Sequence, residues 1–150
     1  VAAEVDIPVY LSSVIQVPWI LTGLRKSQKL GVLCANAPTL TPKLFESCGV
    51  TPEQYDRCVI YGAQDGPEFK KLMADEGNLH YRQLGEEIIG QAEKLAAEHP
   101  ELGAILLECT DMPPFAAEIQ KRTNLPVFDS TTLINYVHSG VARKPFYGFM

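Results

Sequence analysis

Apolar residues along the chain fall into short continuous runs that alternate with longer stretches of helical periodicity. The short runs are rich in β-branched and other apolar residues, and they predict five strands: Ile7–Leu11, Leu30–Cys34, Arg57–Tyr61, Ala104–Cys109 and Pro126–Asp129. Continuous runs of this kind are typical of parallel strands that are covered on both faces. The alternation of strands and helices therefore predicts an α/β fold, in which helices flank a parallel sheet and connect its strands by right-handed crossovers.

Local signals mark where the predicted helices begin and end. The clearest helix spans about 82–98, because its apolar residues recur on one face and Pro100 stands just past its end. Thr41-Pro42 is typical of a helix start, with a capping hydroxyl followed by proline at the first helical position. A Pro-Pro pair opens another predicted helix over about 113–122.

One sequence pattern occurs twice. "DIPVYLSS" (6–13) and "NLPVFDST" (124–131) share the order polar, aliphatic, Pro, Val, aromatic, any residue, Ser, and Ser or Thr. Chance similarity of two strand-turn-helix starts is one interpretation. The other is a duplication that gives two similar α/β halves facing each other. On that interpretation the position equivalent to Cys109 falls upstream of Val1, so the first half would be incomplete.

Composition excludes several classes of function. A chain of 150 residues with 46% hydrophobic content suits one ordinary globular domain. Its net charge of −5, without a basic stripe, argues against nucleic acid or an anionic membrane as partner. No apolar run approaches the roughly 20 residues of a membrane-spanning helix.

The four cysteines lack CxxC spacing, which favours reduced thiols in the cytoplasm over disulfides or zinc. Since the three histidines have no ligand spacing either, we expect no metal site.

Cys109 is the first candidate for chemistry, because it ends a predicted strand. Ligands of open parallel sheets bind beyond the carboxyl ends of the strands. A helix starting near Pro113 would lower the pKa of a nearby thiol and attract a substrate carboxylate, while Thr110 adds a hydroxyl. A buried core cysteine is the alternative. Asp111 either accepts a proton or caps that helix, and Glu108 either faces the cleft or pairs with a base.

A second polar cluster follows the strand that ends at Cys34. Asn36, Thr39 and Thr41 in the sequence "ANAPTLTP" could donate hydrogen bonds to a substrate carboxylate at the next helix start. The alternative is a buried thiol followed by ordinary loop and capping residues. Both interpretations remain open on the residues alone.

Three segments together resemble the aspartate/glutamate/hydantoin racemase superfamily, in its uncharacterised branch. They are "LLECTDMPP" (106–114), "LPVFDSTTLINYVHSG" (125–140) and "DIPVYLSSVIQVPWI" (6–20), and the resemblance covers nearly the whole chain. It implies flavodoxin-like α/β half-domains related by a pseudo-twofold repeat, with the active site between them. Here 1–28 would be the remnant of an incomplete first half, and 29–124 the second half. Segment 125–150 would hold the final strand and helix and return to the first half.

The resemblance also implies a reaction. Members of the superfamily need no cofactor, are commonly dimers, and use one cysteine from each half. Cys109 would be the second-half catalytic thiol, and Thr110, Asp111, Asn36 and Thr41 would contact a small carboxylate substrate. Glutamate racemases often carry histidine where Asp111 stands, which argues against strict glutamate specificity. The first cysteine of the family would lie upstream of the given chain, so Cys34 is not promoted to catalysis.

We therefore expect a cytoplasmic, cofactor-independent amino-acid or hydantoin racemase that assembles as a homodimer. One thiolate would remove the proton next to the carboxyl or carbonyl group and the opposite thiol would return one. Two alternatives stay open: a one-thiol decarboxylase or cis-trans isomerase of small dicarboxylates, and a non-catalytic small-acid-binding relative. Without an upstream half-site, the given chain is expected to be inactive alone as a two-base racemase.

Overall fold

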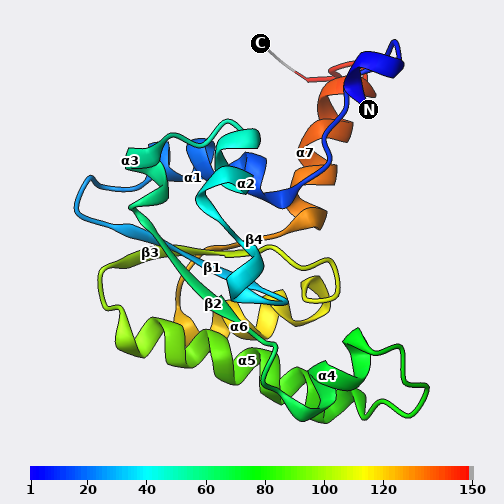
Figure 1. Cartoon of the computed structure of the whole chain (residues 1–150). Helices are drawn as coiled ribbons and strands as arrows, with labels where there is room; N and C mark the ends of the chain where they lie inside the picture. The colour runs from blue at the N-terminus through cyan, green and yellow to red at the C-terminus, as the bar shows by residue number, and fades with distance from the viewer. Residues whose placement is uncertain (149–150) are drawn as a thin grey trace.

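Four parallel strands form the central sheet in the order β2-β1-β3-β4 (Figure 1). The structure, a computed structural model, describes residues 1–148. The strands are β1 (Lys29–Cys34), β2 (Cys58–Gly62), β3 (Leu102–Leu107) and β4 (Val127–Phe128). The parallel sheet with its flanking helices confirms the predicted α/β fold class.

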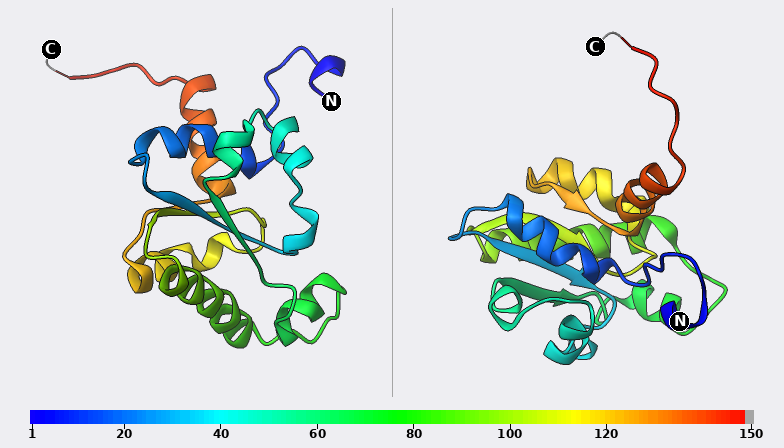
Figure 2. Two further views of the ribbon diagram at one scale, coloured as in Figure 1. Left: turned by 60° about the vertical axis from the view of Figure 1, so that its left-hand side comes forward. Right: turned by 90° about the horizontal axis from the view of Figure 1, so that it is seen from above.

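Helices cover both faces of the sheet (Figures 1 and 2). One face carries α1 (Val17–Gly23), α2 (Pro42–Ser47) and α3 (Pro52–Tyr55), and the other carries α4 (Pro67–Met73), α5 (Tyr81–Glu98) and α6 (Ala116–Thr123). The last helix, α7 (Ser130–Val141), follows β4 directly. Short 3₁₀ turns are η1 (Ala2–Glu4), η2 (Ser13–Gln16), η3 (Ala37–Thr39) and η4 (Pro113–Phe115).

Two apolar clusters, one on each side of the sheet, make up the core. Side chains alternate along β1, so Val32 packs with α1 and α2 while Leu33 packs with α5 and α6. The apolar stripe predicted for 82–98 is buried on α5, where Ile88 is completely inaccessible. Burial of each such side chain contributes about 1.5–3 kcal/mol, so the clusters hold β1 and β3 rigidly in place.

The predicted strand Ile7–Leu11 is wrong. Residues 7–11 are extended but belong to no strand, and the side chains of Ile7 and Leu11 are 70% and 73% exposed. The physical reason is that no strand within residues 1–148 lies beside this segment to accept its backbone hydrogen bonds. The other predicted strands exist with shifted ends: β3 stops at Leu107, two residues before Cys109.

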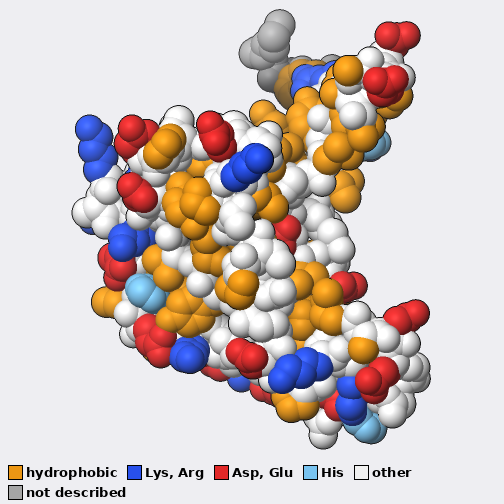
Figure 3. Space-filling view, viewed as in Figure 1, with side chains coloured by type: hydrophobic (Ala, Val, Ile, Leu, Met, Phe, Trp, Pro, Cys, Tyr) orange, Lys and Arg blue, Asp and Glu red, His pale blue; other side chains and the backbone are white. Residues whose placement is uncertain are grey.

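Helix α7 and the N-terminal segment project from the body of the fold (Figures 1 and 2). None of the residues of α7 is buried, and Ile134, Tyr136 and Val141 are each more than 60% exposed. Apolar side chains are conspicuous over this projecting part in Figure 3. Within the described residues, α1 of segment 1–28 and β4 of segment 125–150 pack on the sheet of 29–124. The last two residues of 125–150 lie outside the described residues.

Candidate active site at the carboxyl edge of the sheet

The carboxyl ends of β1 and β3 lie side by side. Leu33 is in register with Leu107, and the Glu108 N–H donates to the Leu33 carbonyl at 2.8 Å. Cys34 therefore stands at the level of Glu108, and Cys109 lies just beyond that edge. Parallel α/β sheets bind their ligands at such an edge, which makes it the candidate site of this chain.

A cavity of about 270 Å³ opens at this edge. Three segments of the chain build it: 10–13 from the N-terminal segment, the turn after β3, and the start of α7. Its polar wall consists of the hydroxyl groups of Ser12, Ser13, Thr110 and Ser130 and the carboxyl group of Glu108. No Lys, Arg or His is among the described residues that line it, so a bound carboxylate would rely on hydroxyl and N–H donors.

Buried side chains from η2 connect these three segments. Ser13 Oγ donates to the Glu108 carbonyl at 3.3 Å, and Gln16 Nε2 donates to the Asp129 carbonyl at 3.0 Å. Ser13 and Gln16 are 6% and 5% exposed, so these hydrogen bonds are shielded from water. Sequence reasoning missed both residues as parts of the site. The one available signal was the serine pair at the end of the first repeat copy, which corresponds to Ser130 and Thr131 in the second.

The thiol of Cys109 is half-buried beside two acidic groups. Its Sγ donates to Asp111 Oδ2 at 3.6 Å. Burial is the main cause that raises the pKa of Cys109 to about 11; the Asp111 N–H opposes this shift, and the charges of Asp111 and Glu108 reinforce it. The expectation that a helix start lowers this pKa is wrong. The turn after Cys109 begins with Pro113 and Pro114, which have no N–H to donate.

The acidic neighbours of Cys109 have separate positions. Glu108 lines the cavity and takes part in no ion pair among the described residues. Of the two alternatives that the sequence left open, Glu108 therefore faces the cleft and does not pair with a basic side chain. Burial raises the pKa of the Glu108 carboxyl above its usual range. Asp111 is exposed and does not cap a helix, because η4 and α6 start after Met112 and Phe115, with no side-chain cap.

Cys34, the last residue of β1, and the polar residues that follow it do not line the cavity. Cys34 is completely buried, donates to the Tyr61 carbonyl at 3.3 Å, and has its pKa raised to about 12, mainly by burial. Thr41 caps α2, as predicted, by accepting from the Leu44 N–H at 3.4 Å. The Asn36 carbonyl closes the turn η3. Substrate contact by Asn36, Thr41 or Asp111 stays a prediction, whereas Thr110 is in the cavity wall.

Two further properties bear on the site. Within residues 1–148, no group of three or more His, Cys, Asp and Glu side chains is placed to hold a metal ion. No helix of the described chain combines the length and apolar character that crossing a membrane requires.

Comparison with known proteins finds relatives named as lyases. The chain is 30% identical over 146 residues to dimethylsulfoniopropionate lyase 5 of Emiliania huxleyi strain CCMP1516, covering 95% of this chain and 29% of that protein. It is 30% identical over 145 residues to a dimethylsulfoniopropionate lyase of Durusdinium sp. clade D, covering 94% of this chain and 47% of that protein. The chain thus spans less than half of the length of these relatives. No model of a known protein family matches it.

A solved structure shares the fold. Allantoin racemase from Pseudomonas fluorescens aligns with a TM-score of 0.58 and 19% identity, over 91% of this chain and 60% of that chain. This agrees with the α/β fold that the sequence resemblance implies, whereas the pseudo-twofold arrangement and the incomplete first half stay predictions. The predicted racemase function, however, is contradicted, because the relatives by sequence are named for cleavage and not for racemisation. The relatives by sequence are all named as enzymes.

Proposed function

We propose that this chain carries the catalytic base and the substrate cavity of a lyase that cleaves dimethylsulfoniopropionate or a similar small sulfonium carboxylate. The observation that carries the proposal is the 30% identity to lyases of this name, which extends over 94–95% of the chain. The cavity of hydroxyl groups, at the edge where such folds bind ligands, supports it, because Glu108 and Thr110, the chain neighbours of Cys109, line its wall. Of the interpretations from sequence, the one-thiol alternative is the nearer to this reaction.

The cleavage needs one base. Dimethylsulfoniopropionate carries a carboxylate and a dimethylsulfonium group on neighbouring carbon atoms. Removal of a proton from the carbon next to the carboxylate supplies the electron pair of a new carbon–carbon double bond. The carbon–sulfur bond then breaks and its electrons go to sulfur, which leaves as dimethyl sulfide. Acrylate is the second product, and the proton stays on the base.

Cys109 is the base in this proposal. With a pKa of about 11 it is a protonated thiol near neutral pH in the ligand-free protein. A sulfonium cation bound nearby favours the thiolate and lowers this pKa, because an opposite charge stabilises the ionised form. The substrate would thus promote the deprotonation of the group that attacks it. Glu108 and Asp111 raise the negative potential of the edge and favour a cationic substrate.

The carboxylate of the substrate would bind the hydroxyl groups of the cavity. Ser12 Oγ accepts from the Val14 N–H at 3.2 Å, which leaves the proton of its hydroxyl available to donate. Thr110 and Ser130 present hydroxyls to the same cavity. Donors at these positions stabilise the charge that develops on the carboxylate as the proton leaves. Homodimer assembly and a cytoplasmic location stay predictions.

The test is release of dimethyl sulfide and acrylate from dimethylsulfoniopropionate by the chain. Cys109→Ser is expected to lower kcat by roughly 10²–10⁴-fold, the usual contribution of a positioned base. Cys48→Ser is the matched control, because Cys48 is half-buried beside α2 and away from the cavity. Absence of activity in the wild-type chain, or full activity of Cys109→Ser, contradicts the proposal.

A pH profile gives a second readout. Because the thiolate is the active form and the pKa of Cys109 is raised to about 11, kcat/KM is expected to increase with pH throughout the neutral and mildly alkaline range. The increase is roughly tenfold per pH unit below the pKa. The profile of kcat should level off at lower pH, since the bound sulfonium lowers the pKa in the complex. A kcat/KM profile that is flat across this range speaks against a thiol base.

A further inference from the structure

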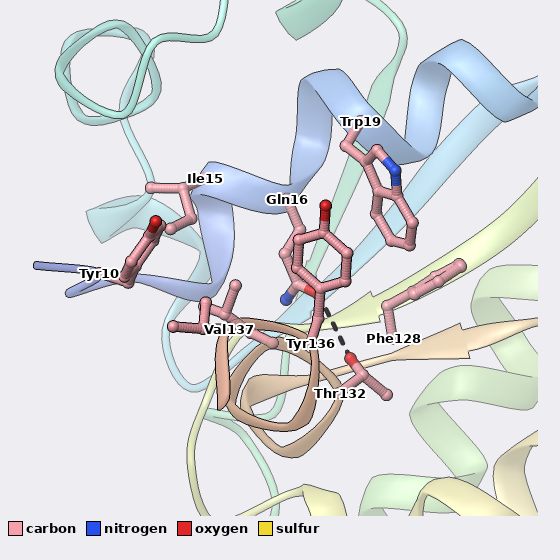
Figure 4. A pocket seen from close by; sticks show the side chains of 9 residues that line it. Tyr10, Ile15, Gln16, Trp19, Phe128, Thr132, Tyr136 and Val137 are labelled. Carbon is pink, nitrogen blue, oxygen red and sulfur yellow. Dashed lines mark hydrogen bonds between the residues drawn. The ribbon is translucent and has the colours of Figure 1, made fainter. Parts of the chain in front are cut away.

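A second cavity, of about 190 Å³, lies between α1 and α7 beside β4 (Figure 4). We call it the aromatic pocket, because its walls include the rings of Tyr10, Trp19, Phe128 and Tyr136. Tyr10 and Leu133 line both this pocket and the cavity at the carboxyl edge, so the two adjoin. A volume below the roughly 300–1,000 Å³ of drug-sized sites suits a small ligand or one end of it.

The rings are arranged around the indole of Trp19. Tyr136 stacks on it with ring centroids 5.8 Å apart and an interplanar angle of 26°, and Phe128 meets it edge-on at 5.5 Å and 83°. Trp19 and Tyr136 are 57% and 68% exposed, so parts of their faces are open to a ligand. Rings held by contact with one another, and not by a long flexible stem, present these faces at little entropic cost.

The amide of Gln16 and the hydroxyl of Thr132 in the pocket are already hydrogen-bonded. Thr132 Oγ1 donates to Gln16 Oε1 at 3.3 Å, shown as the dashed line in Figure 4, and Gln16 Nε2 donates to the Asp129 carbonyl. No Asp, Glu, Lys, Arg or His is among the described residues that line it. The pocket therefore offers aromatic faces and methyl groups, without a carboxylate or a cation.

This chemistry fits a methylated cation. A sulfonium or quaternary ammonium group has no N–H to donate, so it gains little from hydrogen-bond acceptors. The negative faces of Trp and Tyr rings attract such a cation, and the methyl groups around the charge make apolar contacts with the same rings. A net charge of −5 on the chain adds a favourable background potential.

We propose that the aromatic pocket binds the dimethylsulfonium end of the substrate, while the substrate carboxylate occupies the adjoining cavity with Ser12, Thr110 and Ser130. This inference rests on the proposed lyase function and adds the part of the site that selects for the cation. It assigns Trp19 and Tyr136 as the residues that contact the sulfonium methyl groups.

Trp19 is the one tryptophan of the chain, so its fluorescence reports directly on the pocket. Trimethylsulfonium chloride carries the cation without a carboxylate and is not a substrate for elimination. Titration with it is expected to change the Trp19 emission in a saturable way. Tert-butyl alcohol, a neutral molecule of similar shape, is expected to give no saturable change. An equal response to both compounds, or to neither, overturns the proposal.

Variants of Tyr136, on α7, test whether trimethylsulfonium binding depends on the face of its aromatic ring. Tyr136→Leu keeps an apolar side chain on the exposed surface of α7 and is expected to weaken trimethylsulfonium binding by roughly fivefold, as for an exposed cation–π contact. Tyr136→Phe keeps the ring and should retain the binding. Tyr147→Leu is the control, since Tyr147 is 90% exposed and does not line the pocket. Unchanged binding in Tyr136→Leu, with α7 still helical by circular dichroism, overturns the proposal.

Turnover separates this inference from the function it rests on. In Tyr136→Leu the KM for dimethylsulfoniopropionate should rise about as much as the affinity for trimethylsulfonium falls. Lyase activity with an unchanged KM in this variant would overturn the sulfonium subsite and leave the lyase standing. Saturable binding of trimethylsulfonium by a chain without lyase activity would support the subsite and contradict only the lyase.

Discussion

The two copies of the repeated pattern, 6–13 and 124–131, fold differently. In the second copy Val127 and Phe128 pair with β3, and Asp129 caps α7 through a capping box. In the first copy the backbone is extended without a partner strand, and Ser12 caps a short 3₁₀ turn that leads into α1. Both copies thus lead into a helical segment, but their capping residues differ by one position, because Ser12 is equivalent to Ser130 and Asp129 to Leu11. A strand forms only beside a neighbouring strand.

The copies nevertheless meet at one place. Ser12 and Ser13 from the first and Ser130 from the second line the same cavity at the carboxyl edge. The repeated pattern therefore carries two kinds of information. The Ser and Thr positions at its end place hydroxyl groups at the start of a helical segment. The apolar positions before them form a strand only where a neighbouring strand is present.

The largest expected difference between the copies concerns the aromatic residue. Phe128 packs against the core cluster and the edge of Trp19, whereas the equivalent Tyr10 is 50% exposed. Phe128→Ala is expected to lower the free energy of unfolding by about 2 kcal/mol, below the ~3–5 kcal/mol of a fully buried ring. Tyr10→Ala should stay within about 0.5 kcal/mol. Urea unfolding measures both, and equal losses would mean that the two copies are packed alike.

A smaller effect is expected at the residue that joins the copies. Gln16 is buried, donates to the Asp129 carbonyl and accepts from Thr132, so Gln16→Leu removes both hydrogen bonds between the copies, although Thr132 Oγ1 still donates to the Asp129 carbonyl at 2.8 Å. The cost is roughly 1.5 kcal/mol in the free energy of unfolding. Gln120→Leu, on the exposed side of α6, serves as the control and should be close to neutral. A neutral Gln16→Leu would show that the copies are held together by apolar contacts alone.

The smallest expected effect separates the two caps. Asp129 accepts from the Thr132 N–H at 2.7 Å at the start of a 12-residue helix, while Ser12 caps a four-residue turn. Asp129→Ala is expected to cost about 1 kcal/mol and to speed amide hydrogen exchange in the first turn of α7. Ser12→Ala should cost less, because fewer helical residues depend on its cap. Faster exchange in α1 than in α7 after the respective substitutions would reverse this order.

The strands and helices predicted correctly are those that a local apolar pattern marks and that have neighbouring elements to pack against. β1, β2, β3 and α5 follow continuous or periodic apolar runs that the fold buries. The prediction failed at 7–11, where the apolar run is typical of a strand but no strand of the described residues lies beside it. It also failed on the pKa of Cys109, which depends on burial, two nearby carboxylates and two prolines without N–H groups.

The site was predicted in part. Cys109, Thr110 and Glu108 lie at the sheet edge as strand order implied, but Ser13 and Gln16 reach it through contacts 95 and 113 residues away along the chain. No local pattern encodes such contacts. The racemase hypothesis failed for a chemical reason: removal of a proton next to a carboxylate is the first step of both racemisation and elimination. The residues around the base do not indicate whether a leaving group then departs, as in elimination, or a proton returns, as in racemisation.

The hydrogen bond from Gln16 to the Asp129 carbonyl also has a consequence for the order of folding. It connects residues 113 positions apart, so it forms only after nearly the whole intervening chain is in place. Contacts of such long sequence separation form late, since closing a long loop costs entropy before any contact compensates for it. We expect the cavity to be the last part of the domain to assemble. A partly folded chain would then have a core but no competent site, so turnover would begin only once the domain is fully folded.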